Sequence, residues 1–170
     1  MFGIFIGKFQ PLHIGHQKII KEIVDKKCIP VIVICKSYHT KNNLLTTEQI
    51  KCMFNSVYPN IEHYIEMGLE KTPESWYKTF VKNLNQKSIC KNNSIIFYNN
   101  KEIDRIPEFV YKNKIFTNTF YNDIFHYEKW KMHKQTYSNV NISSRNIRKN
   151  YINSKHLLDP IVYTFITQLT

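Results

Sequence analysis

The sequence predicts an α/β fold, a single domain in which helices flank an open parallel sheet. Short apolar runs alternate along the chain with segments whose apolar residues recur at helical spacing. The run 31–35, VIVIC, is apolar at every position, as is typical of a parallel strand covered on both faces. Strands separated by helices favour crossover connections, which place ligands at the carboxyl ends of the strands.

The elements are expected in the following order. Strands are predicted at residues 2–7, 31–35, 61–67, 95–97 and 114–116. Helices are predicted at 14–27, from Thr46 or Thr47 to about 57, from Thr72 onward, and near the end of the chain at about 143–152 and 156–168. Threonine at a helix start can accept hydrogen bonds from the first amides, and Pro73 suits the first turn. Residues 118–140 show no clean period and are expected to form an irregular excursion.

Length and cysteine usage limit the class of protein. A chain of 170 residues fits one domain, 1–170, with the helices at 143–168 packed on it. No window approaches the run of about 18 apolar residues that a membrane span needs, and the start of the chain lacks a signal-peptide pattern. We therefore expect a cytoplasmic protein without a membrane partner. The four cysteines are far apart and form no CxxC, which predicts reduced thiols: Cys28, Cys35, Cys52 and Cys90.

The charge balance indicates anionic partners. The chain carries 24 Lys and Arg against 13 Asp and Glu, a net charge of +11. The lysines are scattered rather than gathered in one block, which favours a solvated basic surface over a nucleic-acid-binding arm. Aromatic and basic residues interleaved at 121–137 still leave a nucleic-acid-binding module open as an alternative from a different class.

A strand, a glycine turn and a helix start follow one another at residues 3–16. Gly7 allows a sharp turn after the first strand, and Pro11 blocks helix until the turn is complete. The helix must then begin near His13, where its unpaired amides and the positive end of its dipole attract anions. Lys8, His13 and His16 add charge or hydrogen-bond donors, and the two histidines share one face of the first turn. This stretch predicts a polyphosphate site.

The same stretch carries a resemblance to a known family. Residues 7–16, GKFQPLHIGH, resemble the G-[KR]-F-x-P-x-H-x-G-H form of the HxGH signature of nucleotidyltransferases. Among these enzymes the pattern is similar to nicotinamide mononucleotide (NMN) adenylyltransferases of the archaeal type and of the bacterial NAD-regulator type. The resemblance implies a Rossmann-like nucleotidyltransferase fold. It also implies adenylyl transfer from ATP to NMN, or to nicotinic acid mononucleotide, giving NAD or its deamido form plus pyrophosphate without a covalent intermediate.

The resemblance also implies roles for the residues of this motif. The residues implied to act on the phosphates in catalysis are His13, His16 and Lys8. Those implied to line the ATP phosphates are Gly7, Phe9, Gln10 and Gly15, and Phe9 is also expected to contact NMN.

A second motif lies near the end of the chain. Residues 141–148, NISSRNIR, resemble the family's ISSTxIR or SGxxIR element. The resemblance implies that Ile142, Ser143, Ser144 and Arg145 bind phosphate, and that Arg148 holds the leaving pyrophosphate. Arg145 stands where many relatives have threonine. By itself the segment is more typical of a capped, basic surface helix, and its pairing with the first motif favours the phosphate-binding role.

Softer matches lie between the two motifs. The loop after the second strand resembles the family loop that lines the nucleotide, with Thr40 and Asn43 matching; Leu44 and Leu45 replace Pro-Phe, and Gln49 replaces Arg. The alternative for this segment is a polar loop followed by a helix cap.

Four further residues are candidates for binding the mononucleotide. Trp76 corresponds by motif order to the tryptophan that stacks on nicotinamide, although it also fits the apolar side of its helix. Tyr98, Asn99 and Asn100 resemble a turn that contacts the mononucleotide, and Asn-Asn is equally an ordinary turn.

The expected partners are ATP, NMN, NAD and pyrophosphate, with Mg²⁺ carried by the phosphates of ATP and no metal site in the protein. Assembly into a homo-oligomer is left open. An alternative within the fold is another acceptor: phosphopantetheine, a flavin mononucleotide, or a phosphorylated alcohol that reacts with CTP. A sensor that binds NAD without turnover is disfavoured by the intact histidines.

Overall fold

A five-stranded parallel sheet forms the centre of the molecule. The computed structural model describes residues 1–36, 44–70, 72–98, 125, 128–134, 142 and 144–168; for Pro73, Arg145 and Asn146 it describes only the backbone. The strands lie in the order β3-β2-β1-β4-β5, and every neighbouring pair is parallel. Their bounds are β1 Phe2–Gly7, β2 Ile29–Cys35, β3 His63–Met67, β4 Ser94–Tyr98 and β5 Met132–Lys134. The predicted Rossmann-like parallel sheet is therefore confirmed.

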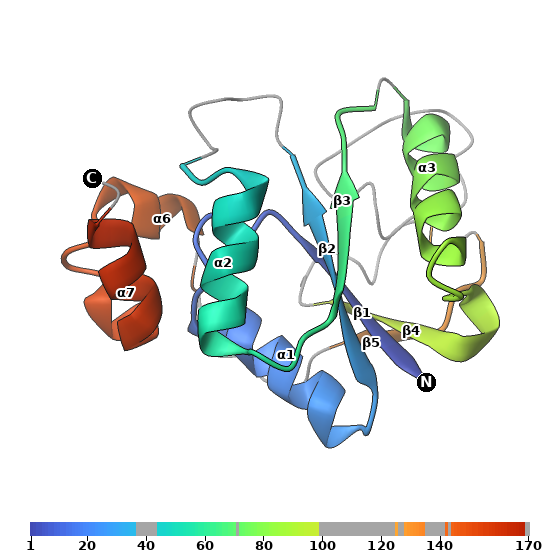
Figure 1. Ribbon diagram of the computed structural model, residues 1–170, viewed down its shortest axis with the longest axis horizontal. Helices are drawn as coiled ribbons and strands as arrows, with labels where there is room; N and C mark the ends of the chain where they lie inside the picture. The colour runs from blue at the N-terminus through green and yellow to red at the C-terminus, as the bar shows by residue number, and fades with distance from the viewer. Residues whose placement is uncertain are drawn as a thin grey trace.

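Helices connect β1 to β2, β2 to β3 and β3 to β4, and further helices close the chain (Figure 1). The α-helices are α1 Ile14–Asp25, α2 Thr47–Val57, α3 Pro73–Asn85, α6 Ser144–Lys149 and α7 Pro160–Thr167; two 3-10 turns are η2 Lys91–Asn93 and η4 Lys155–Leu157. Thr46 and Thr72 accept hydrogen bonds from the amides of Gln49 and Ser75, so the predicted threonine caps are confirmed.

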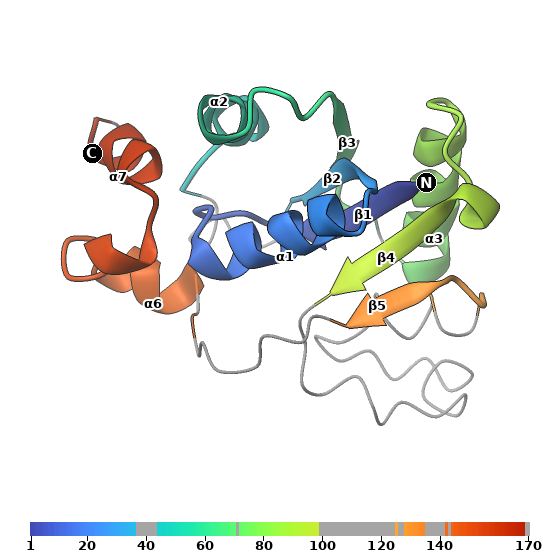
Figure 2. The ribbon, with the colours of Figure 1, turned by 90° about the horizontal axis from the view of Figure 1, so that it is seen from below.

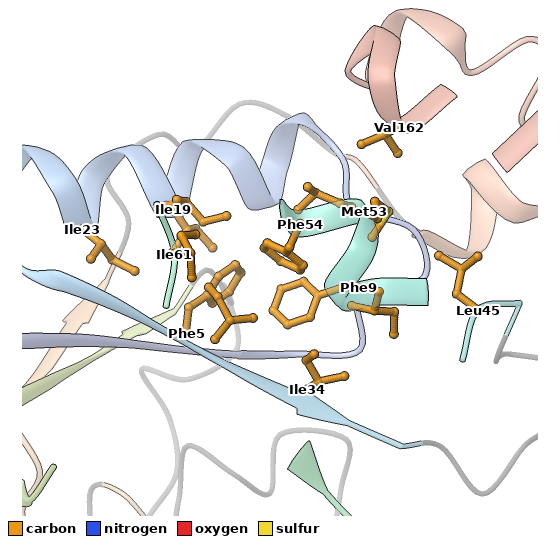
Figure 3. Close-up of a cluster of buried hydrophobic side chains, with 14 of the residues drawn as sticks. Phe5, Phe9, Ile19, Ile23, Ile34, Leu45, Met53, Phe54, Ile61 and Val162 are labelled. Carbon is orange, nitrogen blue, oxygen red and sulfur yellow. The ribbon is translucent and has the colours of Figure 1, made fainter. Parts of the chain in front are cut away.

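Alternating side chains of the strands supply two apolar cores, one on each face of the sheet. On β1, Phe5 belongs to the core beneath α1 and α2, and Ile4 belongs to the core beneath α3. The first core holds Phe9 and Phe54 at its centre (Figure 3). Both faces of the central strands are thus covered, as the continuous apolar run of β2 predicts.

The C-terminal helices lie beside the beginning of α1 (Figure 2). The side-chain amide of Gln17 on α1 donates to the carboxylate of Asp159, the N-cap of α7, at 3.3 Å. Ile147 of α6 and Val162 of α7 are fully buried in the same core as α1 and α2. The last segments of the chain are therefore held against the carboxyl end of β1, where the first motif lies.

The structure differs from the sequence-based expectation in two places. The region 118–140 contains β5, which extends the sheet beyond β4. The last helix begins at Pro160 rather than near 156, because residues Lys155–Leu157 form a 3-10 turn and Asp159 caps the helix. The strand expected at 114–116 lies outside the described residues.

Three further observations concern the described part of the chain. The helices there are all too short or too polar to span a membrane. The four cysteines are free: Cys28 and Cys35 are buried, and Cys52 and Cys90 are exposed. The described residues hold no cluster of three His, Cys, Asp or Glu side chains suited to a metal ion.

Candidate functional site

Two histidines build the start of α1. His13 is the N-cap residue, with an extended backbone at φ −142° and ψ 170°. Its Nδ1 accepts a hydrogen bond from the amide of Gly15 at 3.2 Å, and its own amide donates to Nδ1 of His16 at 3.3 Å. This reciprocal pair satisfies two donors that a helix start leaves unpaired, which is the role that Ser and Glu play in an ordinary capping box.

These two contacts assign the positions of the ring protons. A neutral imidazole has one N–H and one acceptor nitrogen, and Nδ1 is the acceptor in both rings. The proton of each neutral ring therefore lies on Nε2. Nε2 of His13 then donates to the hydroxyl oxygen of Ser144, 3.1 Å away. The helix start thus fixes both histidines as Nε2–H donors.

Both imidazoles are neutral at pH 7. The rings stack with centroids 3.7 Å apart and planes 21° from parallel. Burial lowers the pKa of His13 from 6.5 to about 4. Burial, and then the adjacent His13, lower the pKa of His16 well below 6.5. Because one imidazolium disfavours a second, the two rings present two N–H dipoles rather than two charges.

Phe9 supports this pair from beneath. Phe9 is 1% exposed, and its backbone has a φ of 49°. Its ring packs edge-on against the rings of Phe54 and His16, at centroid distances of 4.9 and 5.1 Å. Gly7 is required next to it, since a Cβ there would lie 2.8 Å from the Phe9 ring. The structure thus gives the Phe9 ring a packing role, and its contacts with ATP and NMN stay predictions.

The C-terminal motif meets the first motif. Besides the contact between His13 and Ser144, the guanidinium of Arg148 donates to the backbone oxygen of Gln10 at 2.8 Å. These pairs are 131 and 138 residues apart in the chain. The half-buried Ile142 packs against the core on the same face of the sheet. The fold therefore brings together the two segments that the sequence marks as phosphate-binding.

Gln10 belongs to the first of these segments and is buried, with 3% exposure. Its side-chain amide donates to the backbone oxygen of Leu45, and the amide of Leu45 donates to its Oε1, both at 2.8 Å. The sequence predicts a phosphate contact for Gln10, but Leu45 occupies both polar ends of its side chain. This link could not be found from the sequence, because a backbone partner 35 residues away leaves no residue pattern.

Lys8 and Tyr98 lie at the carboxyl end of the sheet. Lys8 is exposed and follows Gly7, the last residue of β1. The positive charge of Lys8 acts to lower the pKa of Cys35, which lies at the end of β2. Burial has the larger effect and raises this pKa to about 12. Tyr98 is half-buried at the end of β4, the neighbour of β1. Both residues are therefore on the expected edge of the sheet.

Trp76 is a core residue in this structure. Its indole is 4% exposed and stacks on Phe80 with planes 11° apart and centroids 5.2 Å apart. Of the two interpretations that the sequence leaves open, the packing one describes its surroundings, and stacking on nicotinamide stays a prediction.

Gly15 lies with little room beside the N-cap, since a Cβ there would be 3.1 Å from the ring of His13. The remaining predicted positions, Thr40, Asn43, Asn99, Asn100 and Ser143, lie outside the described residues, as does the side chain of Arg145.

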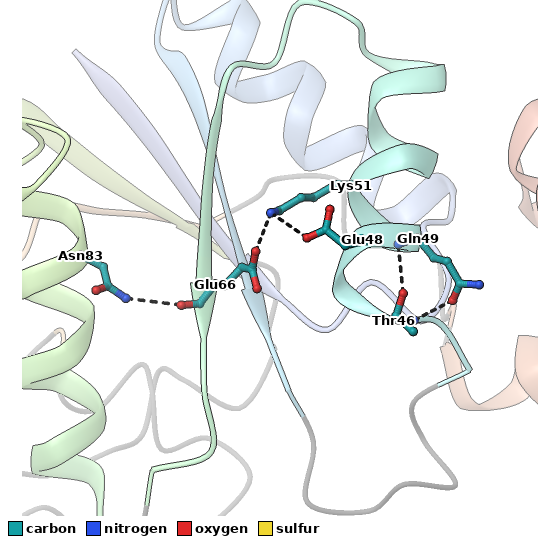
Figure 4. A network of polar contacts seen from close by, with 6 residues as sticks. All are labelled: Thr46, Glu48, Gln49, Lys51, Glu66 and Asn83. Atoms are coloured by element: carbon teal, nitrogen blue, oxygen red, sulfur yellow. Dashed lines mark hydrogen bonds and ion pairs between the residues drawn. The ribbon is translucent and has the colours of Figure 1, made fainter.

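The start of α2 is held by polar contacts (Figure 4). The backbone amide of Gln49 donates to Thr46 Oγ1 at 3.2 Å, and the side-chain Oε1 of Gln49 accepts from the backbone amide of Thr46 at 2.8 Å. Lys51 of the same helix pairs with Glu48 at 3.3 Å and with Glu66 of β3 at 2.5 Å. The hydrogen bond with Glu66 is the main cause that raises the pKa of Lys51. Gln49, which replaces the family's arginine, is therefore a capping residue here.

Comparison with known proteins agrees with this arrangement. The family model described as cytidylyltransferase-like matches residues 4–150, which include both motifs. The chain belongs to the cytidylyltransferase-like family. Its parallel sheet with the HxGH turn at the end of β1 is the nucleotidyltransferase fold that the sequence predicts. No curated protein is significantly similar to this cytidylyltransferase-like chain.

Two solved structures from Francisella tularensis share the fold. One is a bifunctional NMN adenylyltransferase/ADP ribose pyrophosphatase, with a TM-score of 0.67 and 21% identity; the other is such an enzyme complexed with AMP and a Mn ion, with a TM-score of 0.65 and 22% identity. Each alignment covers 98% of this chain and 48% of the other, so the cytidylyltransferase-like chain spans about half the length of those chains.

Proposed function

We propose that this nucleotidyltransferase transfers the adenylyl group of ATP to NMN or nicotinic acid mononucleotide. The products are NAD or its deamido form and pyrophosphate. The observation that carries the proposal is the contact between His13 and Ser144, which joins the two phosphate-binding motifs. The Francisella tularensis structures, whose names include NMN adenylyltransferase, support the choice of acceptor.

The reaction needs alignment and charge stabilisation rather than an enzyme nucleophile. A phosphate oxygen of the mononucleotide attacks the α-phosphorus of ATP, and the bond to the bridging oxygen of pyrophosphate breaks in line. His13 and His16 donate from Nε2–H to the α- and β-phosphate oxygens, where negative charge grows. Lys8, Ser143 and Arg148 hold the departing pyrophosphate. Two neutral donors admit the triphosphate without the repulsion that two buried imidazolium ions would exert on each other.

A divalent cation fits this site as a partner of the nucleotide. The side chains brought together here are imidazoles, a hydroxyl and an arginine, which bind phosphate oxygens rather than Mg²⁺. We propose that Mg²⁺ arrives on ATP, where it neutralises phosphate charge as a Lewis acid. The Mn ion in one of the Francisella tularensis structures is consistent with the use of a divalent metal.

A second candidate is cytidylyl transfer from CTP to a phosphorylated alcohol, which the description of the matching family favours. Adenylyl transfer to phosphopantetheine or to a flavin mononucleotide is the other alternative within the fold. ATP and CTP, each labelled at the α-phosphate, separate these reactions when they are incubated with a panel of acceptors and resolved by thin-layer chromatography. We expect a labelled dinucleotide only with ATP and a pyridine mononucleotide.

Two outcomes of this panel would contradict the proposal. Labelled product from CTP, or from another acceptor with ATP, would reassign the substrate. Steeply salt-dependent binding of RNA or DNA without pyrophosphate release would favour the nucleic-acid-binding alternative.

A further inference from the structure

We propose that Gln10 is a positioning residue that fixes the start of α2 relative to the histidine loop, residues 8–13. This inference rests on the proposed nucleotidyl transfer and deepens it. Gln10 acts through the backbone of Leu45, and its side chain does not touch the phosphates.

The geometry of the Gln10 side chain supports a fixed spacing. Its Nε2 donates to the oxygen of Leu45, and its Oε1 accepts from the amide of Leu45, each at 2.8 Å. Two hydrogen bonds of opposite direction to one residue fix orientation as well as distance. Both side chains are buried, Gln10 with 3% exposure and Leu45 with 5%. Because water does not replace these bonds, losing them leaves a buried amide and carbonyl unpaired.

The backbone of Gln10 makes the third connection. Its carbonyl oxygen accepts from the guanidinium of Arg148 on α6 at 2.8 Å. Gln10 thus joins three segments: the histidine loop, the residues before α2, and α6. The histidine loop and α6 carry the proposed phosphate-binding motifs. The residues before α2 follow β2 in the chain and lead into that helix.

Neighbouring residues hold Gln10 in place. Phe9 and Leu12 on either side along the loop are 1% and 0% exposed, and both belong to the core that also contains Leu45. Because these residues are anchored in the core, the histidine loop cannot shift to compensate when the side-chain amide of Gln10, and with it the two hydrogen bonds to Leu45, is removed. We expect the segment at Leu45 to shift instead, which changes the spacing across the nucleotide site.

The test uses Gln10→Met with a matched control, Gln49→Met. Methionine keeps the length of the side chain and removes both hydrogen bonds. Gln49 also accepts from a backbone amide at 2.8 Å, that of Thr46, and this bond stays within the capping box of α2. Both variants lose a glutamine bond near the start of α2. Gln10→Glu is the second test variant, because it keeps the acceptor for the Leu45 amide and loses the donor to the Leu45 oxygen.

Three measurements are made on the full chain: hydrogen exchange of the Leu45 amide, melting temperature, and kcat and KM with ATP as the varied substrate. Misalignment of a reacting pair by about 1 Å lowers rates about 100-fold, so we expect kcat of Gln10→Met to fall by between about 10- and 100-fold. We expect KM for ATP to change less than about threefold, because the phosphate donors remain. Gln49→Met should lower the melting temperature and leave kcat within about twofold of wild type, as expected for a surface cap.

The outcomes separate this inference from the proposed function. Fast Leu45 exchange with a selective loss of kcat in Gln10→Met supports the positioning role. Retained Leu45 protection, or kinetics equal to those of Gln49→Met, overturns it. If Gln10→Met does not fold, Gln10→Glu decides by the same criteria. A wild-type protein that binds ATP and makes no dinucleotide overturns the proposed function, whereas the exchange result still reports whether Gln10 holds Leu45.

Discussion

His13 and His16 stack ring on ring at the first turn of α1, with centroids 3.7 Å apart, and each uses Nδ1 to accept a backbone amide. In the proposed reaction the same two side chains therefore cap the helix and act on the phosphates. Because the cap holds Nδ1, Nε2–H is the group that the proposal assigns to the phosphates. Substitutions can separate the two roles, since asparagine has an oxygen that can replace Nδ1 and no equivalent of Nε2–H.

Replacing His16 with alanine should lower kcat far more than it weakens ATP binding. In the proposed reaction the contact of His16 with the phosphates strengthens as charge develops, and loss of one such donor typically lowers kcat by about 100- to 1000-fold. His16→Asn should show the same kinetic loss with a smaller loss of stability, because it retains the acceptor for the His13 amide. Single-turnover rates and calorimetric ATP affinities measure the two effects. Equal losses of rate and affinity would contradict this role.

ATP binding should take up protons. The pKa of His13 is about 4 and that of His16 is well below 6.5, so both rings are neutral at pH 6 to 7. Phosphate charge beside an imidazole raises its pKa, so affinity for ATP should rise as the pH falls toward 6. Calorimetry at pH 6 in buffers of different ionisation enthalpy counts the protons. His13→Asn, which lacks one of the two rings, should take up fewer protons. A wild-type heat of ATP binding that does not depend on the buffer would contradict proton uptake.

Stability should fall as the medium is acidified from pH 7 toward pH 4. His13 binds its proton with a pKa of about 4 when folded and 6.5 when unfolded, so between these values the unfolded state binds more protons and is favoured. The shift corresponds to about 3 kcal/mol of lost stability at pH 4. In urea titrations at several pH values, His13→Asn should show a shallower decline than wild type. Parallel curves for the two proteins would show that His13 does not titrate in this way.

Gly7→Ala should destabilise the fold and disturb the histidine pair. The added Cβ would lie 2.8 Å from the Phe9 ring, which in turn packs on His16. Overpacking of this kind lowers the free energy of unfolding by about 1 to 3 kcal/mol. Gly68→Ala is the matched control, since its Cβ would meet nothing within 4 Å. Urea unfolding should show a loss for the first variant and no loss for the second; equal effects would mean that the Phe9 ring moves aside freely.

The central strands and the first motif could be predicted from the sequence because their signals are local. The uniformly apolar run of β2 indicates a strand covered on both faces, and Gly7, His13 and His16 lie within ten residues of one another. The capping threonines Thr46 and Thr72 are equally local signals.

The rest depends on contacts between distant segments. The strand β5 has three half-buried residues and no apolar period, so only its pairing with β4 defines it. The bond between Gln10 and Leu45 uses backbone atoms, which any residue at position 45 other than proline would supply in full. The Phe9 ring packs on Phe54 and His16 from a left-handed backbone conformation, which the family pattern alone does not indicate.

The central claim is that the joined motifs catalyse formation of a dinucleotide. The direct test is to incubate the wild-type protein with ATP, Mg²⁺ and NMN or nicotinic acid mononucleotide and to quantify dinucleotide and pyrophosphate by chromatography. The variant His16→Asn is assayed in parallel. The account predicts equal amounts of the two products with wild type and about 100-fold less of both with the variant. A folded, ATP-binding wild-type protein that forms no dinucleotide from either mononucleotide would contradict it.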